Sequence, residues 1–142
     1  MKYTVGLIFD QEAKNVLLLR KNYPGWMAGR LNGIGGKIEG NETALECMIR
    51  ESKEETTIQD ENWRFIGDVC GDGFLVSWFA IYGQDFSKID AKTSERLKVV
   101  SVAEMFEANW QTLNNIMPHV KLFTCLALFD DVKFPVFFGD NS

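Results

Sequence analysis

The chain has 142 residues, of which 46% are hydrophobic and 25% are charged, and its formal net charge is −5. This composition is normal for a globular protein, and the acidic balance argues against binding to nucleic-acid polymers or anionic membranes, which favour basic surfaces. No apolar run approaches the ~18–20 residues of a membrane span, and the N-terminus lacks a signal-peptide pattern, so we expect one cytoplasmic domain over residues 1–142.

The first part of the chain predicts strands. Apolar runs favour strands at 2–9 and 15–20, and a segment rich in Gly, Pro and Asn at 21–33 favours a loop. A short strand or turn is expected at 34–38.

A helix is predicted next, over residues 43–55. Thr43 is its expected N-cap, because Glu46 three residues later completes a capping box. Helical spacing predicts a face packed on the core, formed by Ala44, Leu45, Met48, Ile49 and Ser52.

The second half predicts more strands and a second helix. In chain order we expect strands at 63–70, 74–82 and 96–102, a helix at 114–129 with Pro118 in its first turn or interrupting it, and an edge strand at 133–138 containing Pro135. The predicted fold is therefore a mixed sheet with at least two helices, an α+β or α/β sandwich. The odd number of cysteines and the lack of a C-x-x-C pair predict reduced thiols in or near the core, namely Cys47, Cys70 and Cys125.

The first predicted helix carries three like charges close together. Glu51, Glu54 and Glu55 fall within roughly a 100° arc, where like charges destabilise a helix and lie near its unfavourable C-terminal dipole. A divalent cation would relieve the repulsion, because Mg²⁺ prefers carboxylate oxygens and keeps substrate phosphates as further ligands. Arg50, one turn before Glu54, is placed to orient it. The alternative is a solvated acidic face relieved by Arg50 and Lys53.

The residues before this helix favour a phosphate ligand. Gly35 and Gly36 permit close approach of the backbone, and Lys37 supplies a charge that suits a phosphate. A Walker A loop is excluded, because Leu31 and Ile38 stand where that loop needs Gly and Ser or Thr. The dinucleotide-binding pattern G-x-G-x-x-G also fails at its third glycine.

Residues 36–58 resemble the Nudix box, G-x5-E-x7-R-E-U-x-E-E-x-G-U, in which U is a bulky aliphatic residue. The matching positions are Gly36, Glu42, Arg50, Glu51, Glu54, Glu55 and Ile58. Two positions depart, with Ser52 in place of an aliphatic residue and Thr57 in place of glycine. We expect Ser52 to face the core with its hydroxyl bonded to the Met48 carbonyl, and Thr57 to be strained if its φ is positive.

The resemblance implies a Nudix fold, an α/β/α sandwich, and hydrolysis of a nucleoside diphosphate linked to another group. The implied ligands of Mg²⁺ or Mn²⁺ are the carboxylates of Glu51, Glu54 and Glu55, with help from the carbonyl of Gly36. Such a metal neutralises a pyrophosphate and lowers the pKa of the attacking water. Arg50 would orient Glu54, and Glu42 would support Arg50 or an outer-sphere water. The general base would be a box glutamate or an acid from a distant loop, for which Glu95 is the candidate; a solvated loop carboxylate is the alternative reading of Glu95.

The flanks of the box bear on the substrate. The segment GWMAGRLNGIGGK resembles a loop of the mammalian-type 8-oxo-purine nucleoside triphosphatases, in which the position of Asn32 bonds the base and that of Trp26 lines the pocket. An amide donates and accepts at a purine edge, and an aromatic ring offers a stacking wall. Trp110 is a further candidate wall. That subgroup follows its Trp with two Asp residues that this chain lacks, and Asn115 or Asn114 is the candidate replacement.

The sequence thus predicts a Mg²⁺-dependent pyrophosphohydrolase of nucleoside triphosphates, a monomer or homodimer that acts on small nucleotides and serves nucleotide-pool sanitation. The alternative within the same class is hydrolysis of ADP-ribose, a sugar nucleotide or a dinucleoside polyphosphate. The alternative of a different class is a catalytically silent Nudix-like binding module. Retention of every box acid disfavours the silent module.

Overall fold

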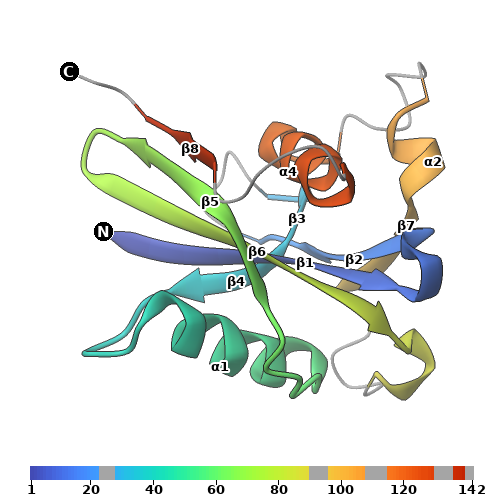
Figure 1. Cartoon of the computed structure of the whole chain (residues 1–142), viewed down its shortest axis with the longest axis horizontal. Coiled ribbons are helices and arrows are strands. Elements are labelled where there is room, and N and C mark those ends of the chain that lie inside the picture. Colours follow the sequence, from blue (N-terminus) through green and yellow to red (C-terminus); the bar gives the residue numbers. More distant parts are fainter. Residues whose placement is uncertain (23–27, 90–95, 108–114, 130–135, 140–142) are drawn as a thin grey trace.

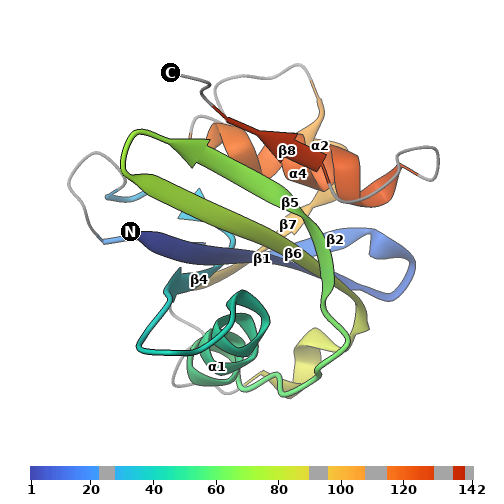
Figure 2. The same cartoon turned by 60° about the vertical axis from the view of Figure 1, so that its left-hand side comes forward.

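A mixed β-sheet runs through the middle of the computed structural model, which describes residues 1–22, 28–89, 96–107, 115–129 and 136–139. Helix α1 (Ala44–Thr56) lies below the sheet and helix α4 (Pro118–Leu128) lies above it in Figure 1. Figure 2 shows the same three layers from a second direction. The predicted α+β sandwich with a mixed central sheet is confirmed.

Strand β1 (Lys2–Asp10) is the centre of the sheet. It pairs in parallel with β6 (Phe74–Gln84) and antiparallel with both β2 (Asn15–Arg20) and β4 (Ile34–Lys37). The main strand order is β3-β2-β1-β6-β5-β8, and β7 pairs with β2. The remaining strands are β3 (Leu31–Asn32), β5 (Arg64–Gly71), β7 (Leu97–Ser101) and β8 (Val136–Phe138). The short helical segments are η1 (Gln11–Ala13), η2 (Phe86–Lys88) and α2 (Val102–Met105).

The sheet separates two hydrophobic cores. Because successive side chains of a strand point to opposite faces, Leu7 of β1 packs in the core with Phe123 of α4, and Ile8 packs with Met48 of α1. Trp78 is 2% exposed and stacks on Phe123 with ring centroids 4.5 Å apart, so it is a core residue. The core that contains Ile8, Ile34 and Met48 fixes α1 against β1 and β4, where the candidate site lies.

Most predicted elements are present, with differences at their ends. The predicted loop at 21–33 contains β3, so Asn32 lies in a short strand. The second predicted helix begins at Pro118, where a missing N–H costs no hydrogen bond. Strand β8 ends the strand order, as the prediction of an edge strand required, although Pro135 itself lies outside the described residues.

The buried face of α1 differs from the predicted one. Leu45 is 39% exposed, whereas Cys47 and Thr56 are completely buried. Periodicity predicts the direction of a side chain around the helix axis, but not how far along the axis the sheet covers the helix. Cys70 is also exposed, contrary to the prediction, because it lies at the end of β5 next to the turn into β6.

The departures from the Nudix box are visible at the end of α1. Ser52 is fully buried, as predicted, but its hydroxyl donates to the carbonyl of Ile58 at 3.1 Å and not to that of Met48. The chain turns back at Thr57, whose φ of 66° is in the left-handed region. This turn brings the Ile58 carbonyl over the last turn of the helix, within reach of the Ser52 hydroxyl.

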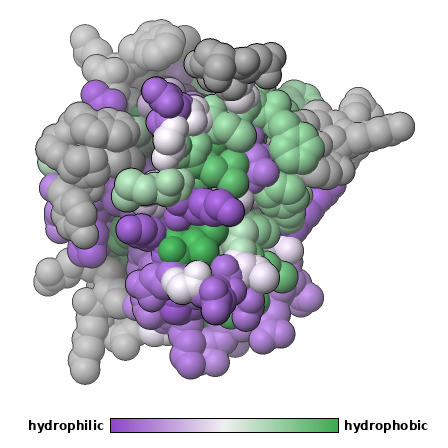
Figure 3. Space-filling model, turned by 90° about the vertical axis from the view of Figure 1, so that its left-hand side faces the viewer, coloured by the Kyte–Doolittle hydropathy of each residue, from purple (hydrophilic) through white to green (hydrophobic). Residues whose placement is uncertain are grey.

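The hydropathy of the surface differs between the layers. Figure 3 shows the face at the left of Figure 1, where hydrophilic residues cover the lower layer that contains α1 and hydrophobic residues gather above it. No helix among the described residues is long and apolar enough to cross a membrane.

Candidate active site

The first turn of α1 is held by the predicted capping box. The Thr43 hydroxyl oxygen accepts the Glu46 N–H at 3.1 Å, and a Glu46 carboxylate oxygen accepts the Thr43 N–H at 3.0 Å. This satisfies two donors that a helix start leaves unpaired. The helix that carries the charged residues is therefore fixed at its beginning.

The two glycines of β4 lie in close contact with neighbouring groups. A Cβ atom on Gly35 would collide with the carbonyl oxygen of Thr4, and a Cβ atom on Gly36 would collide with the carboxylate of Glu51. The Gly36 carbonyl oxygen accepts the Cys47 thiol at 3.8 Å. Glycine at 36 thus lets the main chain lie directly beside Glu51, which brings together two of the predicted metal ligands.

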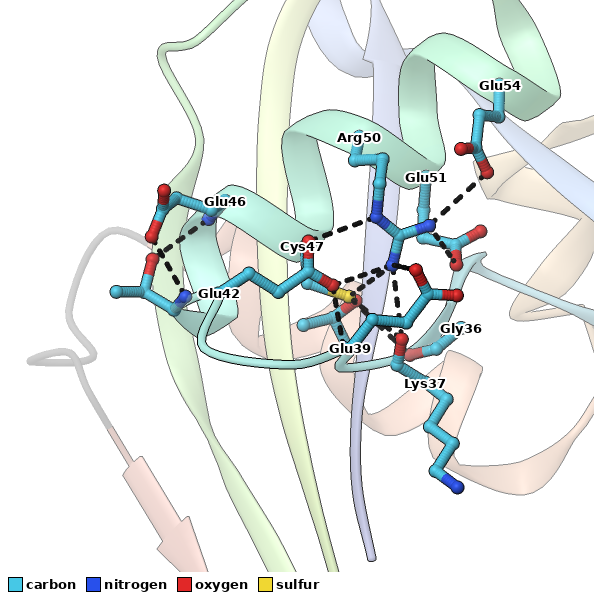
Figure 4. A network of polar contacts seen from close by, with 11 residues as sticks. Gly36, Lys37, Glu39, Glu42, Glu46, Cys47, Arg50, Glu51 and Glu54 are labelled. Atoms are coloured by element: carbon cyan, nitrogen blue, oxygen red, sulfur yellow. Dashed lines mark hydrogen bonds and ion pairs between the residues drawn. The ribbon is translucent and has the colours of Figure 1, made fainter.

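Arg50 is the centre of the polar network in Figure 4. Its Nε and Nη2 donate to the two carboxylate oxygens of Glu42 at 3.0 and 2.7 Å. Its Nη1 donates to Glu51 at 3.1 Å and to Glu54 at 3.3 Å, and its Nη2 also donates to the Lys37 carbonyl at 3.2 Å. Glu42 thus holds the Arg50 guanidinium, and the guanidinium in turn holds Glu54.

The ion pair between Arg50 and Glu42 is ionised over a wide range of pH. The hydrogen bonds from Arg50 lower the pKa of Glu42 to about 2, and those to Glu42 raise the pKa of Arg50. The Glu42 side chain is 16% exposed and the Arg50 side chain 25% exposed. A pair that is so shielded and has two parallel hydrogen bonds is a rigid support.

Glu55 is the carboxylate with the most unusual surroundings. It lies one turn after Glu51, and burial, followed by the adjacent Glu51 carboxylate, raises the pKa of Glu55 to about 8. The charges of Lys21 and Arg96 act in the opposite direction. The Oε2 atom of Glu55 is buried and finds no hydrogen-bond partner among the described residues. An unpaired buried carboxylate oxygen costs free energy, and a cation would satisfy it.

These donors fit a hard divalent cation. Carboxylate and carbonyl oxygens are the ligands that Mg²⁺ and Mn²⁺ prefer, and Glu55 supplies an unpartnered oxygen. In the side-chain arrangement of the described residues, no three His, Cys, Asp or Glu side chains are grouped to hold a metal ion. Glu54 points to Arg50, but its side chain is 58% exposed, against 14% for Glu51, so it has room to change rotamer.

Two further residues lie at this site that sequence reasoning missed. Lys21 donates to the Gly35 carbonyl at 3.5 Å, and its charge opposes the rise in the pKa of Glu55. Cys47 accepts Arg50 Nη2 at 3.6 Å, and burial raises its pKa to about 11, so it is a neutral thiol at neutral pH. Lys21 follows a predicted strand at the start of a loop, which is a weak signal, and Cys47 offers none.

The structure describes some of the predicted substrate residues and not others. Asn32 is 7% exposed, and its side-chain oxygen accepts the Gly33 N–H at 2.8 Å. The main chain at Asn115 is brought beside β3, because the Asn115 carbonyl accepts the Leu31 N–H. The ammonium of Lys37 points away from the glutamates in Figure 4. The candidates that lie outside the described residues are Trp26, Glu95, Trp110 and Asn114.

Comparison with known protein families gives one match over most of the chain. The model of the NUDIX domain matches residues 2–123. The MutT protein from Bacillus halodurans is 23% identical, with a TM-score of 0.68 over 97% of this chain and 88% of that chain. A NUDIX-family hydrolase from Clostridium perfringens is 20% identical, with a TM-score of 0.64 over 91% of this chain and 97% of that chain. At this level of identity, these two structures support the fold.

Two curated relatives are named NAD-capped RNA hydrolase NudC. The protein from Vibrio vulnificus (strain CMCP6) is 28% identical over 104 residues, which are 71% of this chain and 36% of that protein. The protein from Pseudomonas entomophila (strain L48) is 31% identical over 64 residues, which are 45% of this chain and 22% of that protein. The matched region is therefore well under half of the length of either relative.

Proposed function

The chain belongs to the NUDIX family, and from that premise we propose that it is a divalent-metal-dependent pyrophosphohydrolase that cleaves nucleoside triphosphates to monophosphate and pyrophosphate. One observation carries the proposal. The half-buried Glu55 carboxylate, with an unpartnered oxygen, lies next to Glu51, which in turn lies against Gly36, where a Cβ atom would collide with the Glu51 carboxylate. Such a costly arrangement of like charges is typical of a site that binds a cation.

The proposed ligands of Mg²⁺ or Mn²⁺ are the carboxylates of Glu51, Glu54 and Glu55 with the carbonyl of Gly36. When bound, the metal supplies charge neutralisation for the pyrophosphate and lowers the pKa of the attacking water. Arg50 keeps Glu51 and Glu54 on one side of the helix, because the same guanidinium nitrogen donates to both. Glu42 in turn prevents Arg50 from rotating away.

A proton acceptor is also needed. One candidate is a glutamate of the box, because carboxylates are common general bases in enzymes. Glu95 remains the candidate from a distant loop. For the base of the nucleotide we propose contacts with Asn32 and Asn115, whose segments pair through Leu31, and with Trp26 and Trp110. Lys37 is the proposed phosphate contact once its side chain changes rotamer.

The curated relatives favour a second candidate function. Proteins named NAD-capped RNA hydrolases act on a nucleotide cap, so a nucleoside diphosphate joined to another group is an alternative substrate for this chain. The same carboxylates serve both reactions, since either way a bond of a diphosphate is hydrolysed. Contacts outside the metal site therefore decide between the two substrate classes.

A substrate panel separates these candidates. The protein would be incubated with Mg²⁺ and canonical and oxidised nucleoside triphosphates, ADP-ribose, NAD and an NAD-capped RNA oligonucleotide, and kcat/KM would be compared. We expect the highest value for a triphosphate. A higher value for NAD or the capped RNA would replace the triphosphate proposal with the second candidate.

A further inference from the structure

The end of α1 has an unusual backbone. Thr57 follows the last residue of the helix with φ 66° and ψ 1°, a left-handed conformation in which glycine is the usual residue. A β-branched side chain is disfavoured there, because its Cβ crowds the backbone. The N–H of Thr57 still closes the helix by donating to the Lys53 carbonyl at 3.1 Å. Other contacts are therefore needed to keep Thr57 in this conformation.

Two buried hydroxyl groups supply such contacts. The Thr56 hydroxyl donates to the Ser52 carbonyl at 2.7 Å and accepts the Ile58 N–H at 3.1 Å. The Ser52 hydroxyl donates to the Ile58 carbonyl at 3.1 Å. Ser52 and Thr56 are both 0% exposed, so water does not compete for these bonds. We call Ser52, Thr56 and the backbone of Ile58 the hydroxyl clamp.

The hydroxyl clamp fixes both sides of the strained residue. Ile58 has its N–H and its carbonyl bound by side chains from the last turn of the helix, so Thr57 is held between Thr56 and a fixed neighbour. Ser52 stands where the Nudix box has an aliphatic residue, and Thr57 stands where it has glycine. The two departures are thus connected, since the hydroxyl that replaces the aliphatic side chain holds the turn that lacks glycine.

The hydroxyl clamp adjoins the candidate metal site. Glu55 directly precedes Thr56, and Glu51 directly precedes Ser52. The last turn of a helix frays readily, and fraying here would displace the Glu55 carboxylate from its half-buried position beside Glu51. Small displacements of a ligand or a catalytic group cost much activity.

We propose that Ser52 and Thr56 are positioning residues that hold Glu55 in the metal site in place of the missing glycine, a role that rests on the proposed function. The clamp supplies none of the proposed metal ligands. It acts by keeping the last helical turn closed, so that Glu55 presents its carboxylate beside Glu51.

Thr56→Val is the direct test, because valine keeps the shape of threonine and removes the hydroxyl together with its contacts to the Ser52 carbonyl, the Ser52 hydroxyl and the Ile58 N–H. The matched control is Thr124→Val in α4, where the threonine is 0% exposed and its hydroxyl finds no partner among the described residues. Mg²⁺ affinity would be measured by calorimetry without substrate, and exchange of the Ile58 amide by hydrogen-exchange NMR. Ser52→Ala, which removes the bond to the Ile58 carbonyl and the 3.4 Å contact with the Thr56 hydroxyl but keeps both backbone bonds of Thr56, is the milder variant if Thr56→Val does not fold.

We expect Thr56→Val to weaken Mg²⁺ binding about tenfold, as loss of an outer-sphere support does, and to speed exchange of the Ile58 amide. Thr57→Gly added to Thr56→Val should restore the affinity, because glycine adopts the left-handed conformation without help. Thr124→Val should leave both measurements unchanged. Wild-type Mg²⁺ affinity in Thr56→Val, even with lower thermal stability, would overturn the positioning role alone. Absence of Mg²⁺ binding in the wild-type protein would overturn the proposed function and the positioning role with it.

Discussion

Arg50 holds Glu42 by two hydrogen bonds, Nε to Oε2 at 3.0 Å and Nη2 to Oε1 at 2.7 Å. The pair joins α1 to the segment that leads into it, eight residues earlier in the chain. Because the other edge of the same guanidinium contacts Glu51 and Glu54, the position of these two carboxylates depends on Glu42, which contacts neither of them in the network.

Replacing Arg50 by lysine keeps the charge but removes the two-point contact with Glu42. We expect Arg50→Lys to lower kcat about 10- to 100-fold, as loss of an outer-sphere support does. Glu42→Gln should act in the same direction, and the double variant should be less impaired than the product of the single effects, since both changes break one contact. Arg64→Lys, on β5, is the control. Steady-state kinetics on a triphosphate test this, and full activity in Arg50→Lys would contradict it.

The close approach of Gly36 to Glu51 predicts a sensitive position. In Gly36→Ala the new Cβ would collide with the Glu51 carboxylate, which must then move away from the backbone. We expect Mg²⁺ affinity to fall by about tenfold or more, while the far-UV circular dichroism spectrum is retained. In the control Gly139→Ala the nearest atom to the new Cβ is Cys70 Cβ at 3.4 Å, an ordinary contact. Equal Mg²⁺ affinities in the two variants would show that Glu51 is not a ligand.

The raised pKa of Glu55 predicts how stability depends on pH without added metal. Unfolding returns this carboxyl to its ordinary pKa of 4.5, below the folded value of about 8. Between these values the folded state holds a proton that the unfolded state has released, so the contribution of Glu55 to stability is greatest below pH 4.5 and is lost as the pH rises to about 8. The contribution of Glu42 to stability depends on pH in the opposite direction. It is present above pH 4.5 and is lost as the pH falls toward 2.

Thermal unfolding at about pH 5 and about pH 8 measures this difference. We expect Tm to fall between the two pH values by more in the wild-type protein than in Glu55→Gln, which cannot ionise. Saturating Mg²⁺ should remove the additional fall in Tm of the wild-type protein, because a bound cation favours the ionised carboxylate. Parallel pH profiles for the wild-type protein and Glu55→Gln would contradict the raised pKa.

The spacing of charged residues predicted much of the site, because the separation of residues along a helix determines the directions of their side chains around the helix axis. The capping box at Thr43 and the contact of Arg50 with Glu54 follow from short separations along one helix. The proximity of Gly36 to Glu51 followed from the resemblance to a known box, since no helical rule connects the two residues.

The features that the sequence did not predict depend on tertiary contacts. Leu45 fits the apolar face of α1 but is 39% exposed, because the sequence does not show where the sheet ends. The carbonyl that Ser52 bonds belongs to Ile58, which only the left-handed turn at Thr57 brings back over the helix. The charge of Lys21 acts on Glu55 because β2 and β4 both pair with β1, which brings together segments that are far apart in the sequence.

Pyrophosphate release from a nucleoside triphosphate, measured across a Mg²⁺ titration, tests the central proposal most directly. The wild-type protein would be compared with Glu54→Gln, with Glu55→Gln and with the control Glu61→Gln, which changes an exposed glutamate outside α1. We predict that the wild-type protein and Glu61→Gln require Mg²⁺ and release pyrophosphate at equal rates, and that Glu54→Gln and Glu55→Gln are slower by about 100-fold or more. Equal rates in all four proteins, or release that does not depend on Mg²⁺, would contradict a metal site formed by these carboxylates.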